Sequence, residues 1–177
     1  SSDVCSSDLL LFLRDDDIPQ YVADRVADVG IVGENVVAEK KLSSNIMNRL
    51  DIAKCRLSIA VPRSAAYTGK DWLHGKNIAT SYPVITEEFL SRHNISASIH
   101  EISGSVEIAP GIGLADAICD LVSTGSTLLS NGLKEVETVM KSEAVMISSD
   151  GLDEQKDSVL KKLLFRISAV RSARNNK

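Results

Sequence analysis

Short apolar runs alternate with stretches of helical pattern along the chain, and this alternation limits the folds that the chain can adopt. Several runs are apolar at consecutive positions, as strands are when helices cover both faces of their sheet. The clearest candidates are residues 29–32, 56–61, 77–80 and 117–122, where polar residues such as Arg56, Asn77 and Asp120 bound or interrupt the apolar positions. Buried strands that alternate with helices predict an α/β fold with mostly parallel sheets.

The same pattern predicts the remaining elements. Further strands are expected at residues 9–13, 46–52, 97–102, 134–139 and 144–147. Helices are expected at residues 18–27, 34–41, 83–93, 106–112, 127–131 and 152–173. The last helix is the longest, and its apolar face would consist of Val159, Leu160, Leu163, Leu164 and Ile167.

A polar segment at residues 64–75 interrupts the pattern and holds the only tryptophan. We interpret this break as a crossing between two lobes, with a return near residues 142–144. The first lobe would comprise residues 9–62 and 143–177, and the second lobe residues 63–142. Residues 1–8 repeat Ser-Ser-Asp and show no periodicity, so we interpret them as a non-native junction.

The composition argues against two classes of function. With 44% hydrophobic and 25% charged residues, the chain has an ordinary globular composition. Its formal net charge of -4 argues against a surface that binds nucleic acid or an anionic membrane, because either would usually need a basic patch. Basic residues cluster only near the C-terminus, where helical spacing predicts a solvated face: Lys161, Lys162, Arg166, Arg171, Arg174 and Lys177.

The three cysteines, Cys5, Cys55 and Cys119, have no spacing typical of metal ligands, and we expect no protein metal site. An odd number of cysteines without a CxxC pair favours a reducing, cytoplasmic setting. No apolar run approaches the ~20 residues that a membrane-spanning helix requires.

Residues 117–128 combine four features that suit a sugar phosphate. Residues 117–122 form an apolar strand, and Asp120 lies near its carboxyl end, where ligands bind in open α/β sheets. The following Thr124-Gly125-Ser126-Thr127 offers hydroxyls and closely spaced backbone N–H groups, and Gly125 permits backbone conformations that a side chain would disfavour. A helix begins there and contributes its N-terminal dipole. A plain polar turn with a Ser or Thr helix cap is the alternative.

The longer segment from Glu107 to Leu128 resembles the signature of the ATP phosphoribosyltransferase family. It reads Glu-Ile-Ala-Pro-Gly-Ile-Gly-Leu-Ala-Asp-Ala-Ile-Cys-Asp-Leu-Val-Ser-Thr-Gly-Ser-Thr-Leu, and every signature position is filled. Other segments also resemble the family: residues 13–19, 28–35, 55–57 and 79–83. The resemblance extends from about residue 10 to the C-terminus.

The resemblance implies the first step of histidine biosynthesis. In that reaction, 5-phosphoribosyl 1-pyrophosphate is joined to N1 of the adenine of ATP and pyrophosphate is released, with Mg2+ required. The family's catalytic part resembles a two-lobed, periplasmic-binding-protein-like (type II) fold with the site in the cleft. Carried over, Thr124, Gly125, Ser126 and Thr127 would hold the donor's 5-phosphate, and Asp120, with Asp116, would contact the ribose. Glu107 is a candidate for orienting substrate or metal.

The remaining candidates have open alternatives. Tyr82 stands between a strand and Pro83, where it would stack on adenine or shield the end of the sheet. Arg14 and Asp16 follow a strand and are candidates for the ATP site, whereas Asp17 is explained by helix capping. Arg56 would form either an ion pair or a phosphate contact. The sequence identifies no general base.

Two rival functions remain open. A purine or pyrimidine salvage phosphoribosyltransferase also uses an acidic strand end and a Thr-Gly-x-Thr loop, but it usually carries two adjacent acids where this chain has Cys119 and Asp120. A non-catalytic, two-lobed solute-binding or sensor domain would bind a ligand without turnover.

The ends of the resemblance imply limits and partners. The family's first strand and substrate-facing loop have no counterpart here, so we expect part of the ATP site to be missing and this fragment to be inactive. The likeness is closer to the long form of the family, which implies a homo-oligomer with histidine as feedback inhibitor. The short form relies instead on a separate partner subunit.

Overall fold

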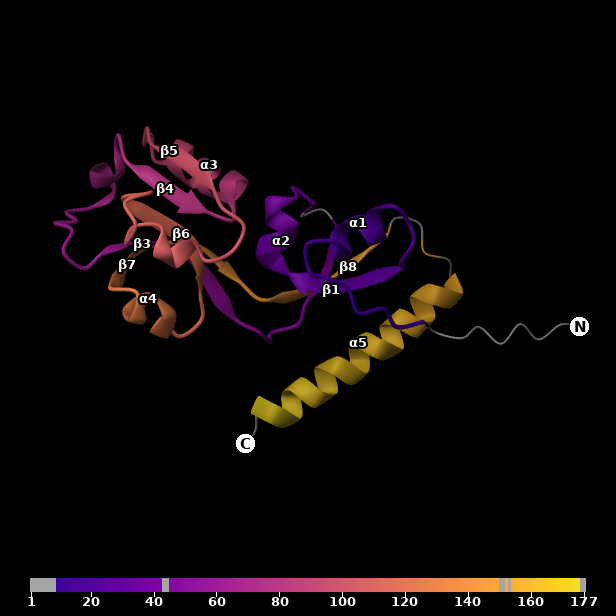
Figure 1. Ribbon diagram of the computed structural model, residues 1–177. Helices are drawn as coiled ribbons and strands as arrows, with labels where there is room; N and C mark the ends of the chain where they lie inside the picture. Colours follow the sequence, from indigo (N-terminus) through magenta and orange to yellow (C-terminus); the bar gives the residue numbers. More distant parts are fainter. Residues whose placement is uncertain (1–8, 43–44, 150–151, 153, 176–177) are drawn as a thin grey trace, which may run out of the picture.

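The computed structural model describes residues 9–42, 45–149, 152 and 154–175 (Figure 1). The non-native junction expected at residues 1–8, with Cys5, lies outside the described residues, as does Lys177. Two sheets form two lobes that lie side by side, and the long helix α5 (Glu154–Asn175) lies along the lobe of the smaller sheet (Figure 1).

The smaller sheet has three strands in the order β1 (Val29–Gly33), β8 (Ala144–Ser148) and β2 (Ile46–Arg49). Successive side chains of a strand point to opposite faces, so β8 serves two cores. Val145 and Ile147 pack with α1 (Ile18–Ala23) and α2 (Glu34–Glu39), whereas Met146 packs with Leu160 of α5.

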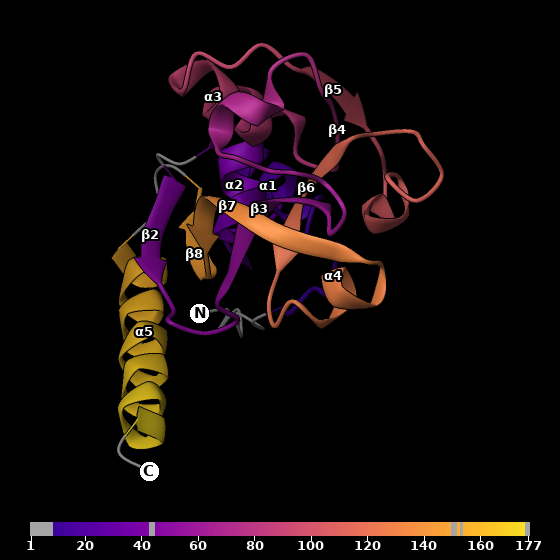
Figure 2. The same cartoon turned by 90° about the vertical axis from the view of Figure 1, so that its left-hand side faces the viewer.

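The larger sheet has five strands in the order β5 (Ser98–Glu101), β4 (Asn77–Thr80), β6 (Ala117–Val122), β3 (Cys55–Pro62) and β7 (Leu133–Ser142). Helix α3 (Pro83–Arg92) and the 3-10 helix η2 (Lys70–Leu73) cover one face. The 3-10 helix η3 (Val106–Ile108) and α4 (Ser126–Ser130) cover the other (Figure 2).

The predicted α/β class is confirmed, but the sheets are mixed. Strand β4 pairs in parallel with β5 and with β6. Strand β3 is antiparallel to β6 and to β7, and the smaller sheet is antiparallel throughout its described pairings. The expectation of mostly parallel sheets is therefore wrong outside β5, β4 and β6. The reason is that β3 carries the chain into the larger sheet and β7 carries it back, so the two neighbours run in opposite directions.

Several predicted elements differ from the structure, and the helix expected at residues 106–112 is only the three-residue 3-10 helix η3. The apolar run 9–13 is not a strand, and Leu9 and Phe12 are 81% and 90% exposed, because no strand in the described part of the chain pairs with it. Among the described side chains of α5, Leu160, Leu164 and Ile167 pack against the core, whereas Val159 and Leu163 are 50% and 45% exposed.

One predicted domain limit also differs. The first lobe was expected to extend to residue 62, but residues 55–62 form β3 of the larger sheet. The other limits of the two-lobe division remain a prediction.

Candidate functional site

Three parallel strands of the larger sheet end at the same edge, and the segments that follow them carry most of the predicted site. Thr80 of β4 lies level with Glu101 of β5 and with Cys119 of β6. Tyr82 comes just after β4, Glu107 lies in η3 after β5, and residues 123–127 follow β6. The carboxyl edge of parallel strands is where α/β proteins bind ligands.

The loop after β6 has the geometry expected of a phosphate-binding turn. Gly125 has a φ of +82°, a left-handed conformation that disfavours a side chain, although its nearest neighbour, Val122 Cγ1, lies 3.9 Å from where a Cβ would stand. Helix α4 begins at the next residue. The hydroxyls of Thr124 and Ser126 are 3.0 Å apart, and both side chains, with that of Thr127, are exposed. The hydroxyls of three loop residues therefore face solvent together.

Asp120 lies in β6, three residues before this loop, and its side chain is half-buried. Its Oδ1 accepts a hydrogen bond from the backbone N–H of Leu121 at 2.8 Å. Burial raises the pKa of the Asp120 carboxyl, and the nearby Glu107 carboxylate raises it further, whereas the Leu121 N–H opposes the shift. Asp120 and Glu107 are thus brought within electrostatic range of each other.

Tyr82 is held firmly at the start of α3. Its backbone N–H donates to Thr80 Oγ1 at 2.9 Å, its carbonyl accepts from the Thr86 hydroxyl at 2.7 Å, and its phenol oxygen accepts from Asn35 Nδ2 at 3.2 Å. Burial raises the pKa of Tyr82 to about 12, with additional contributions from three carboxylates, those of Asp120, Asp15 and Asp16.

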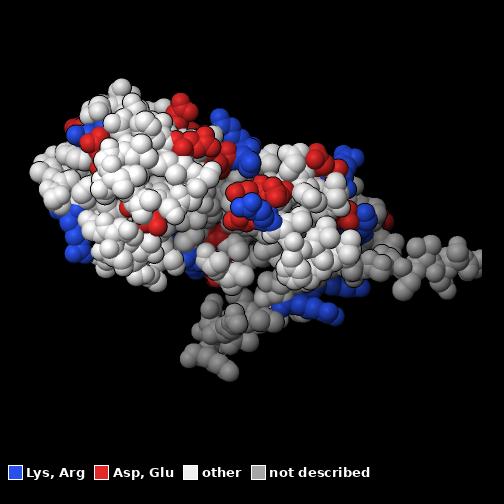
Figure 3. Space-filling model, in the orientation of Figure 1, with Lys and Arg blue, Asp and Glu red and all other residues white. Residues whose placement is uncertain are grey.

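The turn before α1 therefore faces the edge of the larger sheet. The backbone N–H of Asp17 donates to the carbonyl of Arg14 at 3.0 Å, which closes this turn, and the side chains of Arg14 and Asp16 are exposed. On the face shown in Figure 3, acidic and basic side chains gather side by side where the two lobes meet. Electrostatic coupling thus links Tyr82 to Asp16 and to Asp120, and Asp120 to Glu107, with Arg14 in the same turn as Asp16.

Asp116 is the predicted site residue that does not join them. It precedes β6, and the six residues of this strand separate it by roughly 20 Å from the loop at ~3.3 Å per residue. Its Oδ2 accepts from the backbone N–H of Asn77 at 2.9 Å, and its Oδ1 lies 3.7 Å from Lys76 Nζ. These contacts tie β6 to β4, so the predicted ribose contact of Asp116 has no support in the geometry.

Arg56 makes an ion pair, one of the two alternatives that the sequence left open. Its guanidinium contacts both carboxylate oxygens of Glu135 on β7, and Ser58 donates to the same carboxylate at 2.8 Å. Arg56 Nη1 also lies 3.4 Å from the carbonyl oxygen of Ser123, at the start of the loop. Arg56 therefore connects the start of the loop to Glu135 on β7.

The sequence did not reveal the contribution of helix α2. Asn35 contacts Tyr82, and the carboxylate of Glu39 accepts from the N–H groups of Val84 and Ile85 at 2.9 and 3.1 Å, at the start of α3. A helix N-terminus favours such a carboxylate. Asn35 ends a segment, residues 28–35, that resembles the family, but no role for either residue followed from the sequence, and only their contacts in the fold supply one.

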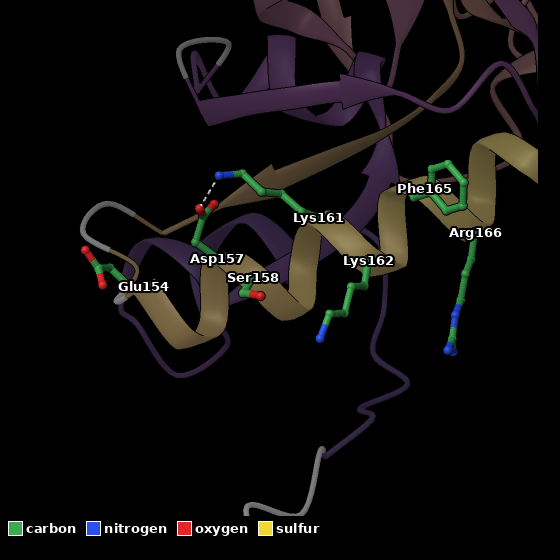
Figure 4. Close-up of a pocket in the computed structure, with 7 residues that line it drawn as sticks. All are labelled: Glu154, Asp157, Ser158, Lys161, Lys162, Phe165 and Arg166. Atoms are coloured by element: carbon green, nitrogen blue, oxygen red, sulfur yellow. Dashed lines mark ion pairs between the residues drawn. The ribbon is translucent and has the colours of Figure 1, made fainter.

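Other features of the described residues lie apart from this edge. No three His, Cys, Asp or Glu side chains among them gather as metal ligands, and no helix in the part searched is long and apolar enough to span a membrane. A hollow of about 620 Å3 runs along α5 (Figure 4), lined by Glu154, Asp157, Ser158, Lys161, Lys162, Phe165 and Arg166. None of the site candidates lines it.

The fold is shared with two-lobed binding proteins. The substrate-binding protein of an amino acid ABC transporter matches with a TM-score of 0.65 at 16% identity, over 90% of this chain and 72% of that one. The aliphatic sulphonate binding protein SsuA from Escherichia coli also matches with a TM-score of 0.65, at 12% identity, over 92% of this chain and 62% of that one. At these identities the likeness concerns the fold alone.

Sequence comparison shows the family. The profile of ATP phosphoribosyltransferase matches residues 14–169. The enzymes of that name from Cytophaga hutchinsonii and Bacteroides thetaiotaomicron are 60% and 58% identical over 95% of this chain. The chain belongs to the ATP phosphoribosyltransferase family, as the signature predicted, and spans 59% of the length of these two relatives. A solved ATP phosphoribosyl transferase (HisG:HisZ) complex from Thermotoga maritima matches with a TM-score of 0.77 at 27% identity, over 89% of this chain and 77% of that one.

Proposed function

We propose that this chain is the catalytic part of an enzyme that joins ATP to 5-phosphoribosyl 1-pyrophosphate in the first step of histidine biosynthesis. The observation that carries the proposal is the meeting of the loop after β6, Asp120, Glu107 and Tyr82 at one edge of the larger sheet. Membership in the family supports it.

The donor half of the site follows from the loop. Thr124, Ser126 and Thr127 present exposed hydroxyls, and Gly125 allows the backbone to turn toward a phosphate. Asp120 is a carboxylate at the carboxyl end of β6 and would accept hydrogen bonds from ribose hydroxyls. Arg56 fixes the start of the loop through the Ser123 carbonyl.

The ATP half lies opposite, toward the smaller sheet. Tyr82 would place its ring or its hydroxyl against the nucleotide, and Arg14 and Asp16 would face the nucleotide from the turn before α1. Holding two substrates with their reacting atoms in line is the main contribution that such a cleft makes to a displacement at the ribose C1. Positive charge develops on that carbon as pyrophosphate leaves, and nearby carboxylates favour it.

Mg2+ fits this site as a cation that arrives with the donor. The described residues offer no cluster of three ligands, but Mg2+ often keeps water and substrate phosphates as most of its ligands and needs one or two carboxylates. Glu107 and Asp120 are the carboxylates that would face it, and the ion would neutralise the departing pyrophosphate.

The wider setting is part of the proposal. Cys55 and Cys119 are free thiols, which suits a cytoplasmic location. We expect the intact enzyme to be a homo-oligomer, with histidine as feedback inhibitor if it is of the long form.

Donor binding tests the proposal within this chain. Calorimetric titration with 5-phosphoribosyl 1-pyrophosphate and Mg2+ is expected to give binding that Thr124→Ala weakens about 10-fold, the effect of losing roughly one hydrogen bond to a charged group. In the intact enzyme, Thr124→Ala and Asp120→Ala are expected to abolish phosphoribosyl-ATP formation with little loss of fold. Wild-type turnover in both variants would refute the loop assignment, and ligand binding without pyrophosphate release would favour a solute-binding protein.

A further inference from the structure

Asn35 is a buried polar residue that links the two lobes. It lies in the first turn of α2 and is only 4% exposed, as is Ser142 at the end of β7. The backbone N–H of Asn35 donates to Ser142 Oγ at 3.1 Å, and the Ser142 hydroxyl donates to Asn35 Oδ1 at 2.8 Å. Asn35 Nδ2 in turn donates to the phenol oxygen of Tyr82 at 3.2 Å.

This chain of hydrogen bonds fixes the direction of each donor. Ser142 Oγ accepts from a backbone N–H, so its own hydrogen is available for Asn35 Oδ1. In the structure the side-chain oxygen of Asn35 faces Ser142, and its NH2 group faces Tyr82. Because the phenol oxygen accepts this bond, the phenol hydrogen remains available for another acceptor.

We propose that Asn35 is a positioning residue that keeps the Tyr82 hydroxyl as a hydrogen-bond donor toward an acceptor atom of the bound nucleotide. The inference rests on the proposed function and extends it, because it assigns Tyr82 a direction and names the residue that sets it. Burial keeps the phenol protonated far above neutral pH, so the donor is present under all ordinary conditions.

Gly33 makes room for this arrangement. A Cβ at position 33 would lie 2.5 Å from Asn35 Oδ1. The backbone of Gly33 has φ -66° and ψ 136°, which any residue adopts, so conformational freedom does not explain the glycine. What a side chain at position 33 would disturb is the Asn35 amide.

The hydrogen bonds that connect Ser142, Asn35 and Tyr82 also join the two lobes beside the site. Glu39, one turn further along α2, accepts from two N–H groups at the start of α3, and α3 begins directly after Tyr82. A change at Asn35 should therefore alter the position of Tyr82 directly, because the two side chains are hydrogen-bonded. The loop after β6 follows a different strand and has no such contact with Asn35. This separation provides the test.

A double-mutant cycle in the intact enzyme measures the coupling. Asn35→Ala and Tyr82→Phe are each expected to lower kcat/KM for ATP about 10-fold, and the double variant is expected to be no worse than Tyr82→Phe alone. Asn35→Asp should be at least as damaging as Asn35→Ala, because a carboxylate would accept the phenol hydrogen and turn it away from the nucleotide. Gly33→Ala should reproduce the loss, and Asn48→Ala, at an exposed position of β2, should leave turnover unchanged.

The Kd for 5-phosphoribosyl 1-pyrophosphate separates positioning from general damage, since it should stay within about twofold of the wild type in Asn35→Ala. An equal loss of donor affinity, or additive effects in the double variant, would show that Asn35 supports only the fold and would overturn the inference. Unchanged kcat/KM in Asn35→Ala would overturn it as well. A wild-type enzyme without any phosphoribosyl-ATP formation would instead refute the proposed function, and the inference with it.

Discussion

At the scale of single residues, the candidate site contains a carboxyl group, that of Asp120, whose charged form lowers the stability of the folded protein. Asp120 is a half-buried carboxylate whose pKa is raised by burial and by Glu107. A carboxyl with a raised folded-state pKa binds its proton more tightly in the folded protein than in the unfolded chain. The contribution of this carboxyl to stability is therefore fully present below its ordinary pKa of 3.8 and is lost as pH rises through the folded-state pKa.

Asp120→Asn should therefore increase the stability of the ligand-free protein at pH 7 while it abolishes turnover. The amide keeps an oxygen for the Leu121 N–H but carries no charge to desolvate. Urea unfolding midpoints at pH 7 and at pH 4 measure the effect, and the advantage of the variant should shrink at the lower pH. Glu88→Gln, at an exposed position of α3, is the control and should show no such gain. A less stable Asp120→Asn protein at pH 7 would contradict this reading of the site.

Gly125→Ala tests the backbone of the phosphate loop. Alanine meets no steric obstacle there, since the nearest atom would be 3.9 Å away, but the φ of +82° disfavours any Cβ by ~1–2 kcal/mol. We expect a loss of about that size in the free energy of unfolding, together with weaker donor binding. Gly111→Ala is a matched control because its backbone is not in the left-handed region. Equal effects of the two substitutions would show that the left-handed turn is unimportant.

At the scale of elements, the loops after β4, β5 and β6 supply the site, and α2 joins them to the other lobe. Glu39 of α2 accepts hydrogen bonds from Val84 and Ile85, whose N–H groups have no partner within their own helix turn. This contact joins the two lobes directly after Tyr82, because α3 begins at the next residue.

Glu39→Ala should destabilise the protein by about 1.5–3 kcal/mol, the usual range for a hydrogen bond to a charged group, because it leaves two N–H groups of α3 unsatisfied. Chemical denaturation measures the loss, and Glu87→Ala, at an exposed position of α3, should change stability by less than ~0.5 kcal/mol. Hydrogen exchange should locate the increased opening at the start of α3. If exchange rises uniformly along the chain instead, the contact has no specific role between the lobes.

Many of the helices and strands could be predicted from the sequence, and the incorrect predictions have a physical cause. The strands at residues 77–80 and 117–122 were predicted with their observed bounds, because each is an apolar run closed by polar residues. The run 9–13 looks the same in sequence, yet burial also requires a neighbouring strand, and pairing is not a local property. The antiparallel direction of β3 and β7 was missed for the same reason.

Candidate site residues could be identified from the sequence where they share one motif. Residues 107–128 marked Glu107, Asp120 and the loop, whereas Asp116, in the same motif, lies at the opposite end of β6. Asn35 was missed because a single buried amide leaves no periodic signal. Its role depends on Ser142 and Tyr82, which are far from it in the chain.

At the scale of the whole molecule, both lobes contribute negative charge to the region around Tyr82. Asp15 and Asp16 come from the turn before α1, and Asp120 comes from the larger sheet. All three carboxylates raise the pKa of the Tyr82 phenol. The net charge of -4 adds to this field. The proposed substrates are polyphosphates, so the free site opposes them unless a cation accompanies them.

Mg2+ should therefore be needed for binding as well as for chemistry. We expect chelation of Mg2+ to weaken binding of 5-phosphoribosyl 1-pyrophosphate by a factor on the order of 10 or more, because each unit of charge removed near such a site contributes about 1 kcal/mol or more. In the Asp15→Asn/Asp16→Asn variant the metal-free affinity should rise, since the repulsion is reduced while the phosphate loop is unchanged. Titration calorimetry with and without a chelator measures both effects, and Asp71→Asn, which replaces one exposed acid in η2, should behave as the wild type. If removing the two acids instead weakened metal-free binding, they would contact the substrate rather than repel it, and the turn before α1 would be part of the donor site.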